Sequence, residues 1–134
     1  MASNRFAMAV HILALLARRG GTMTSEEVAR SVNTNPVVIR RILGHLRRAG
    51  LVCGVSGPSG GSQLCVSPEK ISLFDIYRAV EDGELICVHE DPSRRCPVGR
   101  RIQSVLENVT TGVKRAVAKE LKATKLSAIV RSFG

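Results

Sequence analysis

Aromatic residues are scarce in this chain of 134 residues, which contains three Phe, one Tyr and no Trp. Hydrophobic residues nevertheless make up 44% of the chain, which is enough for a core in a domain of this length. We expect that core to consist of helices packed through Leu, Val, Ile and Ala side chains. The scarcity also argues against RNA as the ligand, because RNA-binding surfaces use aromatic rings to stack on unpaired bases.

Other missing features exclude further classes of protein. No apolar run reaches the ~20 residues that span a bilayer, so no membrane partner is predicted. The N-terminal stretch MASNRFAMAVHILALLARRG has an apolar centre, but the histidine within it and the two arginines after it do not fit a secretory signal peptide. Four cysteines are too sparse for the disulfide framework of a small secreted domain. We therefore expect a cytoplasmic protein.

Catalytic constellations are missing as well. The sequence has no paired carboxylates in a pocket-like context, no placeable Ser, His and Asp arrangement, and no nucleotide-binding motif. The stretch SGPSGG is glycine-rich, but a phosphate-binding P-loop needs a lysine followed by a helix, and here a predicted strand follows without a lysine. We expect that the protein is not an enzyme.

Acidic residues are missing from a long central stretch. The net charge is +9, and the residues up to Pro68 contribute eight arginines against only Glu26 and Glu27. No acidic residue occurs between Val28 and Pro68. Because a merely soluble surface mixes both signs of charge, this imbalance favours a polyanionic partner.

The basic stretch has the pattern of a helix-turn-helix. Thr24 and Glu27 have the spacing of a capping box, which predicts a short helix over 25–31. After the turn NTN, Asn35 caps a second helix with Pro36 at its first position. A short helix, a tight turn and a longer helix form the helix-turn-helix outline.

The fold class that we predict is mainly α with a small β-hairpin: a winged helix-turn-helix domain plus a long C-terminal dimerisation helix. We assign residues 1–82 to the winged domain, 83–96 to a connecting arm, and 97–134 to the dimerisation helix and a helical tail. The remaining predicted elements are an apolar helix over 5–18, strands at 51–55 and 62–66 around SGPSGG, a helix capped by Ser72, a long helix over 97–122 and a short one over 125–132.

The second helix of the predicted pair has two different faces. At 100° per residue, Ile39, Ile42 and Leu46 lie on one side and the arginines lie on the other. The outward side is predicted to bind DNA, with Arg40 and Arg41 near base edges or phosphates. The alternative is a solvated basic face. The full set of predicted DNA contacts is Thr34, Asn35, Val37, Arg40, Arg41, Arg47 and Arg48 on this helix, and Ser56, Gly57, Ser59 and Gly60 in the wing.

The motifs NPVVIRRILGHLRRAGLV, SGPSGG and SLFDIYRAVE together resemble the Rrf-two (Rrf2) family of bacterial winged-helix transcription regulators. That family includes an iron–sulfur cluster regulator, a nitric-oxide-sensing repressor and a cysteine-metabolism repressor. The stretch VHEDPSRRCPVGRRIQSVLE further resembles a branch that lacks the three-cysteine cluster motif. The resemblance covers residues 4–107.

The resemblance implies a homodimer that binds a palindromic operator. Its recognition helix and wing tip correspond here to Val37, Arg40 and Arg41 and to the segment Ser56–Gly61. Family wings often begin with a basic residue and carry an aromatic residue after the glycines, whereas this chain has Ser56 and Ser62 there. This difference argues against deep insertion of the wing into the minor groove.

The long C-terminal helix independently predicts a dimer. Its apolar positions recur at alternating steps of four and three, as in a coiled coil. About 26 residues form ~39 Å of helix, which is too long for so small a domain to cover. Packing within the monomer is the alternative. The predicted dimer seam consists of Ile102, Val105, Leu106, Val109, Val113 and Ala116.

The cysteines leave several interpretations open. Cys87 and Cys96 are candidates for redox sensing, since a helix start and two arginines would favour the thiolate of Cys96. With His11 of a second subunit and His89, the same two cysteines would offer ligands for a [2Fe–2S] cluster or zinc. A purely structural role is the default, with no cofactor and no metal. Cys53 and Cys65 lie in the two predicted wing strands, whose register the sequence does not define, and are interpreted as packing residues.

The sequence thus predicts a homodimeric transcription regulator, a repressor, that binds double-stranded DNA. It would read a pseudo-palindromic operator through the helix Asn35–Ala49 and the wing Ser56–Gly61. Control by thiols or by redox state is an option. The sequence does not define the effector. One alternative is a winged-helix protein-interaction module without DNA binding. Another is an iron–sulfur or metal-dependent sensor that uses Cys87 and Cys96.

Overall fold

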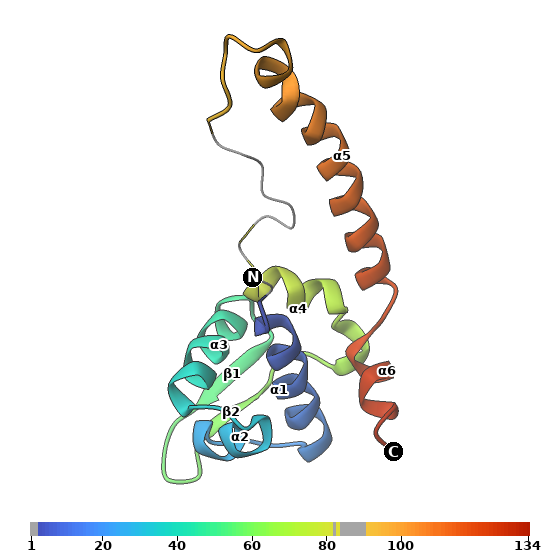
Figure 1. Ribbon diagram of the computed structural model, residues 1–134. Coiled ribbons are helices and arrows are strands. Elements are labelled where there is room, and N and C mark those ends of the chain that lie inside the picture. The colour runs from blue at the N-terminus through green and yellow to red at the C-terminus, as the bar shows by residue number, and fades with distance from the viewer. Residues whose placement is uncertain (1–2, 82, 84–90) are drawn as a thin grey trace. The chain divides into compact units, whose positions relative to one another are not determined.

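The computed structural model describes residues 3–81, 83 and 91–134. The chain forms two compact units, one made of residues 1–82 with 122–134 and the other of residues 83–121 (Figure 1). The predicted fold class is confirmed. The elements are α1 (Arg5–Arg19), α2 (Ser25–Val32), α3 (Pro36–Arg48), β1 (Val52–Val55), β2 (Gly61–Leu64), a 3-10 helix η1 (Pro68–Lys70), α4 (Leu73–Val80), α5 (Pro97–Lys122) and α6 (Leu126–Arg131).

Helix α1 is the centre of the winged unit. It packs against α2, α3, α4, α6 and β2. Ile12, Leu13 and Leu16 on α1 are fully or almost fully buried, as expected for a helix that is apolar on nearly all sides. Gly20 ends the helix in the left-handed conformation that glycine adopts readily. Burial of α1 on several sides therefore holds the helix-turn-helix to the rest of the unit.

The two helices of the motif begin at the predicted caps. The Thr24 hydroxyl accepts a hydrogen bond from the Glu27 N–H, and the Glu27 carboxylate accepts one from the Thr24 N–H. Asn35 Oδ1 accepts from the Val37 N–H at 2.9 Å, and Pro36 occupies the first position of α3. These caps satisfy backbone donors that a helix start leaves free, and they define the angle at which α3 leaves the turn.

Replacing Thr24 by Ala is expected to destabilise the fold, because the Glu27 N–H loses its acceptor while it remains partly buried. Loss of such a cap costs about 1 kcal/mol. The effect is measured as a lower urea midpoint at an unchanged slope. The Thr24→Ser variant keeps the hydroxyl and is expected to match the parent. Equal midpoints for all three proteins would show that the cap contributes nothing.

The wing is an antiparallel hairpin in which Val52 pairs with Leu64 and Val55 with Gly61. Met23, in the connection between α1 and α2, adds a bridge to Ser62, and the two residues exchange backbone hydrogen bonds of 2.9 Å. Leu46 and Val52 are buried on the side that faces the core. The hairpin is thus attached both to α3 and to the start of the helix-turn-helix.

The C-terminal tail belongs to the winged unit, which differs from the predicted domain division. We assigned residues 97–134 to one C-terminal region, but residues 122–134 pack with residues 1–82. Leu126 is fully buried, and its N–H donates to the Ile71 carbonyl at 2.8 Å. In addition, the Lys122 ammonium lies 4.9 Å from the centre of the Phe74 ring. Burial of one apolar side chain and backbone pairing with the segment before α4 therefore decide where the tail lies.

The long helix α5 has the bounds that the sequence predicts, Pro97–Lys122. In the described part of the chain, none of its side chains is buried. The apolar residues of α5 lie along one stripe, which is the pattern of a helix that packs against another surface through one face. Among the described residues, no helix has both the length and the hydropathy needed to cross a membrane.

Candidate nucleic-acid interface

Helix α3 presents a basic face to the outside. Ile39, Ile42 and Leu46 are buried against the core. On the opposite side all four arginines of the helix are exposed, and Val37 beside them is 54% exposed. The predicted orientation of the helix is therefore confirmed. An exposed valine among guanidinium groups is the combination that contacts a thymine methyl group next to base edges and phosphates.

One arginine of this face is paired with a carboxylate, contrary to the expectation of an uncompensated surface. Arg40 Nη2 donates to Glu26 Oε1 on α2 at 2.9 Å. A hydrogen bond from its own backbone, followed by that of Arg40, lowers the pKa of Glu26, which favours its carboxylate form. Both side chains are more than half exposed, and such pairs contribute little to stability. The pair therefore offsets the charge of Arg40 only weakly, and its guanidinium group remains accessible to solvent.

The other three arginines of α3 carry the excess charge. Within the described part of the chain, Arg41, Arg47 and Arg48 form no ion pair with a carboxylate. Arg48 Nη2 lies 2.9 Å from Nδ1 of His45, one turn earlier. The second acidic residue of this region, Glu27, is paired with Arg19 on α1. The positive charge at the C-terminal half of α3 is thus available to a polyanion.

Arg47 lies against the first strand of the wing. A Cβ atom placed on Gly54 of β1 would be 3.3 Å from Nη2 of Arg47 and 3.4 Å from its Cζ. Only glycine leaves the guanidinium its full space at this strand position. The contact joins the recognition helix to the wing, so that the two predicted DNA-binding elements form one continuous surface.

The wing loop is shaped by its glycines. A Cβ on Gly60 would be 2.1 Å from the Val55 carbonyl oxygen, and one on Gly61, whose φ is +151°, would be 2.4 Å from the Met23 carbonyl oxygen. Thr22 Oγ1 donates to the Ser59 carbonyl at 3.1 Å. Figure 1 shows the loop projecting from the body of the winged unit. The small residues therefore permit a tight loop whose exposed amides can face a phosphate.

Comparison with known proteins identifies the family. Residues 2–132 match the model of the Rrf2 family, which is described as iron-dependent transcriptional regulator. The chain belongs to the Rrf2 family of DNA-binding transcriptional regulators. It is 42% identical to the HTH-type transcriptional regulator YwnA of Bacillus subtilis, with 97% of each chain covered. It is 32% identical to the HTH-type transcriptional regulator IscR of Cereibacter sphaeroides, covering 96% of this chain and 84% of that protein.

A solved structure supports the same assignment. A crystal structure whose protein is described as DNA-binding superimposes with a TM-score of 0.75 at 37% identity, covering 93% of this chain and 97% of that chain. YwnA and IscR are named as transcriptional regulators and not as enzymes. The fold of this Rrf2 protein therefore agrees with that of a protein described as DNA-binding.

The start of the recognition helix is already engaged in the fold. The Asn35 side chain caps α3, and the Thr34 N–H donates to the Ala29 carbonyl at 3.1 Å. Asn33 adopts a left-handed conformation with a φ of 61°, which closes the turn tightly. For this Rrf2 protein, Thr34 and Asn35 thus position the start of α3 through the hydrogen bonds that they make within the turn.

The cysteines of the wing form a disulfide, which corrects the prediction that they are packing residues. Cys53 and Cys65 are bonded, with their Cα atoms 5.6 Å apart. Both are exposed, so neither contributes to the core. The register explains the pairing: Cys53 lies opposite Gln63, and Cys65, two residues further, is on the same face of the hairpin.

Of the other two cysteines, the structure describes only Cys96. Cys96 is exposed and free, and directly precedes α5. Cys87, the other predicted redox residue, and His89 lie outside the described residues. Although the description of the family names iron, no three His, Cys, Asp or Glu side chains among the described residues lie together closely enough to hold a metal ion. The described residues thus do not form an iron site, and the absence of a cofactor stays a prediction.

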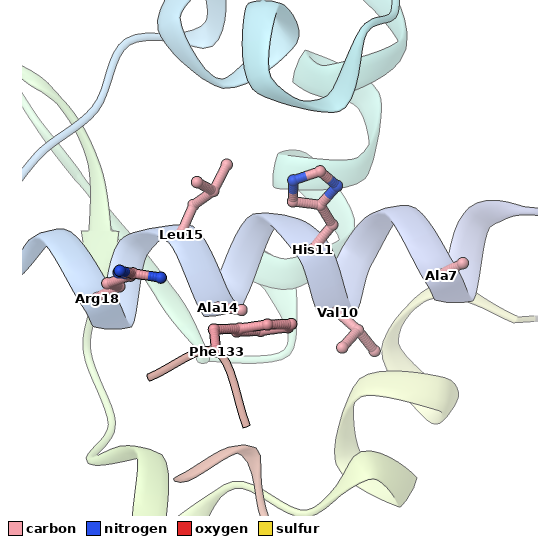
Figure 2. A pocket seen from close by; sticks show the side chains of 7 residues that line it. All are labelled: Ala7, Val10, His11, Ala14, Leu15, Arg18 and Phe133. Carbon is pink, nitrogen blue, oxygen red and sulfur yellow. The ribbon is translucent and has the colours of Figure 1, made fainter. Parts of the chain in front are cut away.

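His11, which we considered as a cluster ligand, contacts α2 instead. Its Nε2 lies 3.3 Å from Oγ of Ser31. Figure 2 shows His11 and Leu15 on one side of α1, whereas Phe133 lies by Ala14 on another. The residues around this open pocket of about 440 Å³ are Ala7, Val10, His11, Ala14, Leu15, Arg18 and Phe133. In the structure His11 therefore joins α1 to α2 at the edge of a mostly apolar surface.

The stripe on α5 is longer than the predicted seam. Val105 and Val109 are 51% and 56% exposed, and the other predicted seam residues are at most half-buried. Val98, which the sequence interpretation missed, is 66% exposed and lies on the same side. The steps from 98 to 102, 105 and 109 are four, three and four, so the heptad spacing already contained this signal.

Proposed function

We propose that this Rrf2 protein is a homodimeric repressor that reads a pseudo-palindromic operator. Helix α3 would lie in the major groove, and the loop Ser56–Gly61 would contact the neighbouring backbone. The observation that carries this proposal is the exposed basic face of α3, where Arg41, Arg47 and Arg48 have no carboxylate partner among the described residues and Arg47 adjoins the wing.

The position along α3 separates two kinds of contact. Val37, Arg40 and Arg41 are in the N-terminal half, which enters the groove in a helix-turn-helix and meets base edges. Arg47 and Arg48 are at the other end, where they suit backbone phosphates that define the register without reading the sequence. Specificity should therefore depend mainly on the first set, and affinity on both.

The proposed dimer uses the stripe on α5. Ile102, Leu106 and Val113 are apolar, and the part of the chain that the structure describes buries none of them. A second copy of α5 would cover the stripe, because a coiled-coil seam buries such positions. A two-fold axis would then present two α3 helices about 34 Å apart, one turn of DNA.

The signal for this regulator is proposed to reach it through thiols. Cys96 is the exposed free cysteine of the described residues, and Cys87 is a second candidate. Because thiol reactivity follows exposure and thiolate character, Cys96 satisfies the first of these two requirements. A cytoplasmic location, in which DNA is accessible, agrees with this proposal.

Binding selection on fragments of the native genome tests the proposed function. The selected fragments are expected to share a pseudo-palindrome. If three arginines of each protomer contact phosphates, the logarithm of the association constant should fall with the logarithm of salt concentration with a slope of about −5. Failure to enrich any sequence, together with binding that does not depend on salt, would favour the protein-interaction module instead.

A further inference from the structure

The wing contains a pair of cysteines that no part of the fold requires for packing. Cys53 in β1 and Cys65 just after β2 are bonded, and both are exposed. The hairpin is already held by its backbone register and by the bridge from Met23 to Ser62. Cys65 also donates its N–H to the Leu51 carbonyl at 3.1 Å. The bond is therefore an addition to a hairpin that forms without it.

The bond encloses the part of the wing that faces DNA. The residues between the two cysteines include the whole loop 56–60, and the sequence separation is 12 residues. Gly54, next to Cys53, lies against the Arg47 guanidinium. Opening the bond would thus remove a restraint from the two ends of the wing loop and from the strand next to Arg47, while the backbone pairing of the hairpin remains.

The redox environment of a DNA-binding regulator determines whether this disulfide is stable. A DNA-binding regulator works where the cell keeps thiols reduced, and disulfides in that compartment are mostly transient and serve redox sensing or catalysis. Thiol–disulfide exchange requires that the attacking group can reach a sulfur, and both residues are exposed. An exposed bond in a reducing compartment is expected to open and close.

We propose that Cys53 and Cys65 form a reversible oxidation site that sets the affinity of the wing for DNA. This inference rests on the proposed operator binding through α3 and the wing. In the bonded form the hairpin is preorganised, so that less conformational freedom is lost on docking. In the dithiol form the loop is less restrained and the operator affinity falls.

A hydroperoxide is the class of oxidant that we assign to this site. One thiolate attacks the peroxide and the O–O bond breaks, so that this cysteine becomes a sulfenic acid and the departing alkoxide takes up a proton to become an alcohol (water from hydrogen peroxide). The second thiol attacks the sulfenic sulfur, which forms the S–S bond and releases water. Two electrons pass from the thiols to the peroxide. A dithiol reductant cleaves the disulfide and restores both thiols, and the reductant is itself oxidised to a disulfide.

The test uses the full-length protein with the operator fragment that the genomic selection yields. It is treated with hydrogen peroxide or with dithiothreitol, and operator affinity is measured for each form. The parent is expected to bind roughly 3- to 10-fold more tightly when oxidised. The matched variants are Cys53→Ser with Cys65→Ser, and Cys87→Ser with Cys96→Ser. The first is expected to lose the difference in affinity that the wing disulfide causes, and the second, which removes the two other candidate thiols, is expected to keep that difference.

Mass spectrometry provides a readout that does not depend on DNA. Trypsin leaves residues 49–70 as one peptide that contains both wing cysteines, whereas Cys87 and Cys96 fall in two other peptides. The peroxide-treated peptide is expected to lose two hydrogen atoms. Absence of this loss overturns the inference, as does equal affinity of the two forms or a response that disappears only in the Cys87→Ser, Cys96→Ser variant. Loss of binding in every form would instead contradict the proposed operator binding, and the inference would fall with it.

Discussion

Reversing both Arg40 and Arg41 to Glu is expected to abolish operator binding and to leave the dimer intact. Both guanidinium groups are on the exposed face of α3, away from the buried side of Ile39 and Leu46. Each base-contacting arginine contributes about 1–3 kcal/mol, and a carboxylate in its place repels the phosphates. The combined loss should therefore be about 100-fold or more in affinity.

The single variants separate the two arginines. Arg40→Glu also places a carboxylate opposite Glu26 and removes the ion pair between α2 and α3, so thermal unfolding is measured for each protein. Arg41→Glu breaks no pair and gives the cleaner loss of affinity. Glu26→Gln frees Arg40 and should strengthen binding by a small factor.

Arg131→Glu on α6 is the matched control for Arg41→Glu, because it makes the same change of charge at an exposed position. It is expected to bind nearly as the parent does. If the double variant at 40 and 41 binds as tightly as the parent, α3 is not the recognition element. If Arg131→Glu loses as much affinity as Arg41→Glu, net charge rather than position explains the effect.

Introducing Asp at both Leu106 and Val109 is expected to give monomers. These side chains lie on the apolar stripe of α5, and Val109 is 56% exposed in the single chain. In a dimer the two carboxylates would be buried without partners, which costs several kcal/mol for each charge. The variant should also lose most of its operator affinity, because each monomer then occupies only one half-site.

Sedimentation equilibrium measures this result directly. The parent is expected at twice the chain mass of 14.4 kDa and the variant at that mass itself. Ser104→Asp is the control, since position 104 lies on the opposite side of α5 from the stripe and is exposed. A variant that keeps the dimer mass would refute the seam on α5. A Ser104→Asp protein that also dissociates would show that any added charge on α5 prevents association.

Local signals in the sequence determined most of the winged unit. Capping residues act on backbone groups two or three positions away, so Thr24, Asn35 and Ser72 could be recognised without a structure. The same holds for the buried and exposed sides of α3 and for the bounds of α5, because helical periodicity alone decides which residues share a face.

Tertiary structure decided the pairings between distant segments. Arg40 meets Glu26, Arg47 lies on Gly54, and Cys53 bonds with Cys65. Each of these contacts depends on a strand register or on the angle between two helices. One residue of slip in the register would turn a side chain to the other face of the hairpin, and the spacing of residues along the chain does not specify that register.

The sequence by itself thus indicated the helix-turn-helix and the location of the positive charge, since these follow from composition and local periodicity, and its motifs indicated the family by their resemblance to known members. Only the tertiary structure showed which arginines of α3 pair with a described carboxylate. It also showed that the tail after α5 packs with the winged unit and that the two wing cysteines are bonded. The physical reason is that ion pairs, backbone bridges and disulfides require atoms within a few ångströms of each other, and packing of the whole unit brings those atoms together.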